Sequence, residues 1–181
     1  MEVSKTELKK IIKKFIEITK KAYKENTTRG YTKQLNELIK NKSYKNFKLD
    51  ASIGIGTLIK NGLPWITFLK KNHKTSKGFY PYLGYDYKNN ILYVKLGTSE
   101  TEEHQCLNIN IDRIEQINKL YGKEFSNPEN SIEKIVDTLD YLVREYETLD
   151  YDCFNGEEKI LLKKTSYKPN PLWTSGNWKN L

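Results

Sequence analysis

The spacing of apolar residues changes period near residue 47, and this change constrains the fold more than any other sequence feature. Before that point apolar residues recur every three or four positions, as in amphipathic helices. From Phe47 to Ile53 they alternate with polar residues, as in a strand with one buried face. Helical spacing returns after Gly97. One block of strands between helical segments predicts an α+β fold.

The helical segments carry their own start and stop signals. Ser4 and Glu7 have the spacing of a capping box, and the periodic run that follows predicts one amphipathic helix ending before Arg29-Gly30. A shorter helix is predicted over 32–40, and two more over 111–120 and 128–149. We expect the last two helices to cover the sheet.

Strands are predicted over 47–53, 66–69, 79–87 and 91–96. Lys88-Asn89-Asn90 separates the last two, and asparagine tolerates the left-handed conformation of a hairpin turn. Three or four strands then form a small, mainly antiparallel, curved sheet flanked by amphipathic helices. We expect one domain over residues 1–154, with 155–181 as a peripheral strand or linker.

Composition excludes several classes of protein. There is no run of about 18 apolar residues, and the first residues alternate charged with apolar side chains, so we expect a soluble cytoplasmic protein that does not enter a membrane. Cys106 and Cys153 are too few for a disulfide framework. His104 with Cys106 supplies two of the four ligands that zinc prefers, so we expect neither a metal nor a cofactor.

Positive charge is concentrated in the first part of the chain. Residues 1–80 contain 19 Lys and Arg against 6 Asp and Glu, a formal charge of +13, whereas residues 81–181 contain 12 against 17, a charge of −5. A basic surface attracts polyanions and gains free energy by releasing their counterions. The lysines of the first helix are open to two interpretations, a phosphate-facing surface or the solvated side of a surface helix.

Catalytic motifs are scarce. The chain has neither a GxxxxGK[ST] phosphate loop nor a GxSxG nucleophile elbow, and neither His73 nor His104 is near a nucleophile in sequence. Asp150 or Asp152 followed by Glu157-Glu158-Lys159 resembles the D…ExK pattern that holds Mg²⁺ in nucleases, but in a chain rich in charge the pattern also arises by chance. We therefore expect a protein that is not an enzyme.

Two segments have a pattern suited to DNA. In Gly54-Ile55-Gly56 the glycines allow a sharp turn and close approach, and Ile55 is either a wedge between base steps or a core residue. In the strand over 79–87, Tyr80, Tyr82 and Gly84 share one face. Tyrosines beside a gap suit a flipped base, which needs flat walls and polar tips; the alternative is an aromatic cluster that fills the core.

Three motifs in order carry a family resemblance: SxGxG at 52–56, PW-x-x-FL at 64–69 and G-x-YP at 78–81, after a basic helix and before a hairpin. Together they resemble the N-terminal DNA-binding domain of McrB-type modification-dependent restriction proteins. The similarity covers about residues 11–97 and, more weakly, 131–149. It does not extend to the C-terminal tail.

The resemblance implies binding of double-stranded DNA with a methylated or hydroxymethylated cytosine, flipping of that base, and a separate GTPase domain and nuclease subunit as partners. Together with the residue patterns, the resemblance leads us to expect a site with three parts. The base pocket comprises Trp65, Tyr80, Tyr82, Gly84 and Tyr121; the wedge loop comprises Ser52, Gly54, Ile55 and Gly56. Flanking lysines are expected to contact phosphates: Lys48, Lys60, Lys70, Lys71, Lys74 and Lys77.

Two positions depart from the family pattern. Ile55 replaces an aromatic wedge, and Gly84 replaces a larger aliphatic residue, which suggests a pocket for a bulkier modification. Two other functions stay open. One is a Mg²⁺ nuclease built on Asp152, Glu157 and Lys159. The other is a protein-interaction module whose basic face meets an acidic partner.

Overall fold

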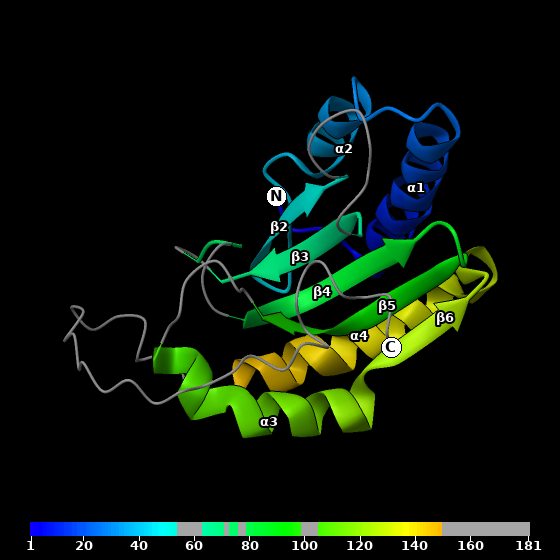
Figure 1. Ribbon diagram of the computed structural model, residues 1–181. Coiled ribbons are helices and arrows are strands. Elements are labelled where there is room, and N and C mark those ends of the chain that lie inside the picture. Colours follow the sequence, from blue (N-terminus) through cyan, green and yellow to red (C-terminus); the bar gives the residue numbers. More distant parts are fainter. Residues whose placement is uncertain (54–62, 71–72, 76–78, 99–104, 150–181) are drawn as a thin grey trace.

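The computed structural model describes residues 1–53, 63–70, 73–75, 79–98 and 105–149, with side chains from residue 110 onward in the last range. Within these residues, helices pack on one face and along one edge of an open, curved antiparallel sheet, as Figure 1 shows. The predicted α+β fold is confirmed. The wedge loop at 54–56, the lysines at 60, 71 and 77, and all residues of the D…ExK pattern lie outside the described residues.

The sheet is a meander, because each strand pairs with the next one along the chain. The strands are β1 (Ser43–Tyr44), β2 (Phe47–Ser52), β3 (Trp65–Leu69), β4 (Phe79–Asp86), β5 (Ile91–Thr98) and β6 (Lys123–Ser126). The sequence predicted β2 to β5 but not the two outer strands. β1 has two residues and β6 has one buried residue, Phe125, so neither shows a period.

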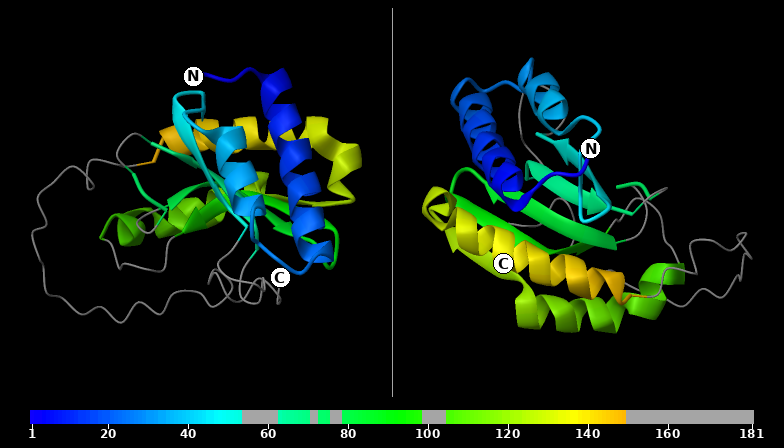
Figure 2. Two further views of the ribbon diagram at one scale, coloured as in Figure 1. Left: turned by 90° about the horizontal axis from the view of Figure 1, so that it is seen from above. Right: turned by 180° about the vertical axis from the view of Figure 1, so that it is seen from behind.

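Four α-helices and one 3₁₀ helix are described: α1 (Lys5–Lys24), α2 (Tyr31–Ile39), α3 (Gln105–Tyr121), η1 (Pro128–Ser131) and α4 (Ile132–Glu147). Seen from behind in Figure 2, α1 and α4 cover one face of the sheet, and α3 runs along its lower edge. The Ser4 hydroxyl caps α1 by accepting from the Glu7 N–H at 3.2 Å, as the capping-box spacing predicted.

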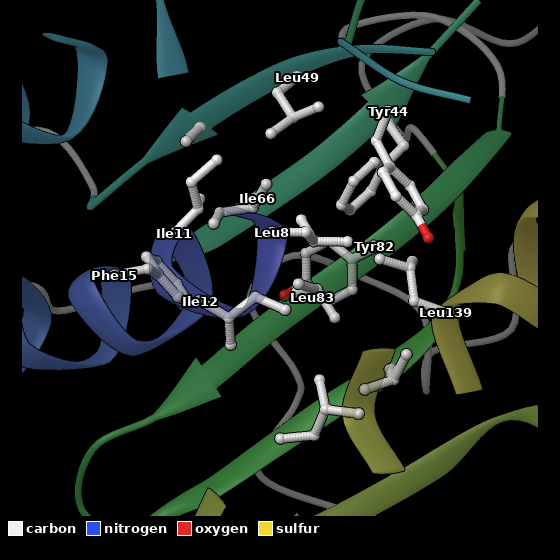
Figure 3. Packing of buried hydrophobic residues seen from close by; sticks show 14 of the residues in the cluster. Leu8, Ile11, Ile12, Phe15, Tyr44, Leu49, Ile66, Tyr82, Leu83 and Leu139 are labelled. Atoms are coloured by element: carbon white, nitrogen blue, oxygen red, sulfur yellow. The ribbon is translucent and has the colours of Figure 1, made fainter. Parts of the chain in front are cut away.

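The core lies between this helical layer and the sheet. Leu8, Ile11, Ile12 and Phe15 of α1 point toward β2, β3 and β4, where Figure 3 shows Leu49, Ile66 and Leu83. All seven side chains are at most 2% exposed, so removing any one of them leaves a cavity in a closely packed interior.

Proline and asparagine fix the shape of β4. The β3–β4 ladder ends at the pair Thr67–Tyr82. The β4 residue just before Tyr82 is Pro81, which has no N–H to donate to β3. At the other end of β4 the hairpin turn contains Asn90 in the left-handed conformation, with φ at 52°, as the sequence predicted. The Asp86 carboxylate accepts the Lys88 and Asn89 N–H groups and stabilises this turn.

Candidate nucleic-acid interface

Strand register gathers aromatic residues on the face of the sheet that points away from α1 and α4. Trp65 pairs with Gly84, Gly84 with Tyr93, and Tyr80 with Gly97, so these residues point to the same side. We call this surface the aromatic face and define it by Trp65, Tyr80, Tyr82, Tyr93, Gly84 and Gly97. The prediction that Tyr80, Tyr82 and Gly84 share one face is confirmed.

Tyr93 and Gly97 also belong to this surface, although neither was predicted as a member of it. The signal was present, because the hairpin turn at 88–90 fixes the β4–β5 register once its position is known. Counting outward from that turn places Tyr93 beside Gly84 and Gly97 beside Tyr80. Cross-strand neighbours on one face pack against each other, so the four residues form one unit.

Glycines allow the Tyr82 ring to lie against the sheet. A Cβ atom at Gly84 would lie 2.2 Å from the Tyr82 Oη and 2.5 Å from its Cζ. At Gly97 the nearest atoms to such a Cβ would be the Tyr82 Cβ at 3.3 Å and Cγ at 3.5 Å, followed by the Tyr80 Cε2 at 3.6 Å. Gly84 was predicted to leave a gap for a base, but the Tyr82 ring occupies that space.

The tyrosines of this face are buried. Tyr80 is 9% exposed and Tyr82 is 6% exposed. Burial raises the pKa of Tyr82 above its ordinary value, with a further contribution from Tyr80. The Tyr80 hydroxyl donates to the Thr75 carbonyl oxygen at 2.8 Å, which orients its ring. A base that stacked on Tyr82 would first have to move the Tyr82 ring away from Gly84.

The predicted phosphate-binding lysines that the structure describes lie on different sides of the sheet. Lys48 of β2 is exposed and pairs with Leu69 on the same side as the aromatic face. The Lys70 Nζ lies 5.7 Å from the ring centroid of Tyr146 in α4, so Lys70 points to the helical layer instead. Lys74 is exposed and follows β3 by five residues.

Ser52 and Tyr121 have different positions relative to the aromatic face. Ser52 is the last residue of β2 and pairs with Trp65, which places the start of the predicted wedge loop next to this face. Tyr121 ends α3 and stacks on Tyr141 of α4, with ring centroids 6.0 Å apart and planes 11° apart. Because Tyr141 belongs to the helical layer, Tyr121 contacts that layer, and its role in the base pocket stays a prediction.

Ion pairs neutralise part of the basic N-terminal helix. Three lysines of α1 reach acidic residues of η1 and α4: Lys5 pairs with Asp137 and Asp140, Lys9 with Glu133, and Lys20 with Glu129. The basic and acidic parts of the sequence therefore meet along α1 and α4. The charge of +13 that the first part of the sequence carries overstates the cationic surface that remains for phosphates.

Neither a metal centre nor a membrane helix is found within the described part of the chain. No three His, Cys, Asp or Glu side chains there are close enough to hold a metal ion. Among the described helices, none combines the length and apolarity that crossing a bilayer requires.

Two comparisons of the sequence with known proteins found no match. No protein-family model matches the sequence, and no curated protein matches it either. The resemblance to the McrB-type domain stays a prediction from the motifs at 52–56, 64–69 and 78–81.

Proposed function

We propose that this protein is a DNA-binding recognition module of a modification-dependent restriction system, and that it reads a modified cytosine on the aromatic face. The observation that carries the proposal is the cluster of Trp65, Tyr80 and Tyr82 around Gly84 and Gly97 on the face without α1 and α4. Flat aromatic rings offer stacking surface, and the space above Gly84 can hold a planar ligand once the Tyr82 ring moves away from it.

Recognition begins when lysines such as Lys48 neutralise backbone phosphates, which positions the duplex without reading its sequence. The target base then leaves the stack and takes the place of the Tyr82 ring above Gly84. A methyl or hydroxymethyl group adds little contact energy, so the fit of the surrounding walls decides whether it is recognised. Cleavage and GTP hydrolysis belong to other domains or subunits of the system.

The test uses short duplexes that differ in one base: cytosine, 5-methylcytosine, 5-hydroxymethylcytosine or N6-methyladenine, with 2-aminopurine beside the target to report flipping. Binding is titrated at two salt concentrations. We expect the affinity to depend on the cytosine modification and the fluorescence to rise on binding. The Tyr80→Ala variant should lose both effects.

Tyr141→Ala is the matched control, because Tyr141 is a half-exposed tyrosine of the helical layer. It should keep the preference and the fluorescence rise. Equal affinity for all four duplexes without a change in fluorescence would contradict the proposed base reading. It would support only a basic surface that binds DNA without reading the base. Nicking of plasmid DNA that requires Mg²⁺ would support the nuclease alternative instead.

A further inference from the structure

A lysine-lined pocket lies between the last turns of α1 and the turn that joins β4 to β5. Its volume is about 460 Å³. Seen from above in Figure 2, the C-terminal end of α1 lies beside this turn. The lining residues come from the two elements: Lys20, Lys21, Lys24, Tyr87, Lys88 and Asn90. None of them belongs to the aromatic face.

The pocket concentrates positive charge from two separate elements. Lys24 and Lys88 are exposed, and Lys20 and Lys21 pair with Glu129 and Glu17. Such surface pairs are weak, and a lysine ammonium that meets a carboxylate keeps further N–H donors for a second anion. Lysines are common near helix C-termini because they complement the helix dipole. That explanation covers the α1 lysines but not Lys88, which comes from the hairpin turn.

Three of the carbonyl groups at the end of α1 already accept backbone hydrogen bonds. The N–H groups of Glu25, Asn26 and Thr27 donate to the carbonyl oxygens of Lys21, Tyr23 and Ala22, which closes the last turn.

Stacking and hydrogen bonds hold the pocket wall in place. Tyr87 stacks on Tyr23, with ring centroids 4.6 Å apart and planes 21° apart. The Asn90 Oδ1 accepts from the Tyr85 hydroxyl at 2.7 Å, and the Asn90 Nδ2 donates to the Asn127 Oδ1 at 2.9 Å. The turn is thereby tied to the chain before η1. A wall that is already ordered loses little entropy when a ligand binds.

We propose that this pocket is a phosphate-binding site, with Lys24 and Lys88 as its main ligands and Tyr87 as its aromatic wall. Phosphate fits better than carboxylate, because a phosphate group can carry two negative charges and offers more acceptor oxygens to several lysine ammonium groups than a single carboxylate does. The phosphate belongs either to a free nucleotide or to the DNA backbone. The site does not depend on the proposed base reading, because no residue of the aromatic face contributes to it.

The experiment compares Lys24→Gln/Lys88→Gln with the control Lys33→Gln/Lys40→Gln, which removes two exposed lysines in and just after α2. Calorimetry with pyrophosphate and with ATP tests the free-ligand source. Titration of an unmodified and a 5-methylcytosine duplex at several salt concentrations tests the backbone source. Circular dichroism checks that both double variants are folded.

If the phosphate comes from a free ligand, pyrophosphate or ATP binds and its affinity falls at least about tenfold in the pocket variant but not in the control. Tighter binding of ATP than of pyrophosphate, lost in Tyr87→Ala, identifies a nucleotide. If the phosphate belongs to DNA, the pocket variant binds both duplexes more weakly by the same factor, and the salt slope falls by about 2.

Base reading predicts a different pattern, because Tyr80→Ala changes the ratio between the modified and unmodified duplexes while the pocket variant leaves that ratio unchanged. Affinities for pyrophosphate, ATP and both duplexes that do not differ between the pocket variant and the control would overturn the phosphate site.

Discussion

At the scale of single residues, two glycines of the aromatic face should differ in their tolerance of a side chain. An added Cβ at Gly84 would overlap the Tyr82 ring, whereas one at Gly97 would need shifts of a few tenths of an ångström. We expect Gly84→Ala to lower the free energy of unfolding by about 1–3 kcal/mol, as overpacking does, and Gly97→Ala to cost less. Urea denaturation measures both, and equal costs would contradict the position of the Tyr82 ring.

Asp140 of α4 contacts three polar side chains from two other parts of the fold. Its carboxylate accepts from the Tyr44 hydroxyl at 2.5 Å, lies 3.0 Å from the Lys45 Nζ and pairs with Lys5. Burial alone would raise the pKa of Asp140, but hydrogen bonds from Lys5, Tyr44 and Lys45 outweigh burial and lower it. The ionised form therefore joins α1, the β1–β2 turn and α4.

The lowered pKa fixes the sign of the pH dependence. The contribution of Asp140 to stability is complete above its unfolded pKa of about 3.9 and is lost as the pH falls through the lower folded value. We expect Asp140→Asn to cost about 1–3 kcal/mol at pH 7 and to flatten the loss of stability below pH 4. Asp137→Asn, at a side chain 58% exposed, is the control and should change stability by under about 0.5 kcal/mol.

At the scale of elements, the side chain of Asn118 continues the sheet where β6 stops. The β5–β6 ladder ends at the pair Val94–Lys123. Two residues along β5, the Leu96 N–H donates to the Asn118 Oδ1 at 2.7 Å, and the Asn118 Nδ2 donates to the Leu96 carbonyl oxygen at 2.9 Å. One carboxamide of α3 thus satisfies both polar groups of a buried backbone position.

Replacing Asn118 by alanine should leave both Leu96 groups without a partner. We expect a loss of about 2 kcal/mol in the free energy of unfolding and faster hydrogen exchange at the Leu96 amide. Gln116→Ala removes an exposed amide from the same helix and should change neither. Unchanged exchange at Leu96 in the Asn118→Ala protein would show that the carboxamide does not support the sheet edge.

The sequence predicts those elements that bury a regular face. The periodic runs predict α1, α2, α4 and β2 to β5 within a few residues, and the asparagines predict the hairpin turn. Sequence spacing does not show which residues from different helices and strands contact each other. Nothing in the sequence around Tyr121 indicates that it stacks on Tyr141 rather than on Tyr80. Nothing around Gly84 indicates that the Tyr82 ring fills the space above it. Both depend on packing between elements, which local patterns do not encode.

At the scale of the whole molecule, folding brings the acidic part of the chain onto the basic part. Ion pairs with α4 and η1 neutralise lysines of α1 on the helical layer: Lys5, Lys9 and Lys20. On the opposite side, Lys48 is exposed on the same side as the aromatic face. The two sides of the sheet therefore offer different surfaces to a polyanion.

This difference predicts which side of the molecule meets DNA. Each lysine that neutralises a phosphate contributes about 0.9 to the slope of log K against log salt. If the duplex lies on the aromatic face, Lys48→Gln should reduce the slope by about that amount, while Lys9→Gln, on the helical layer, should leave it unchanged. Both variants remove one positive charge, so a general effect of net charge would appear equally in each. The opposite result would place DNA against α1 and α4, where base reading by Tyr80 and Tyr82 is impossible because the sheet lies between them and the duplex.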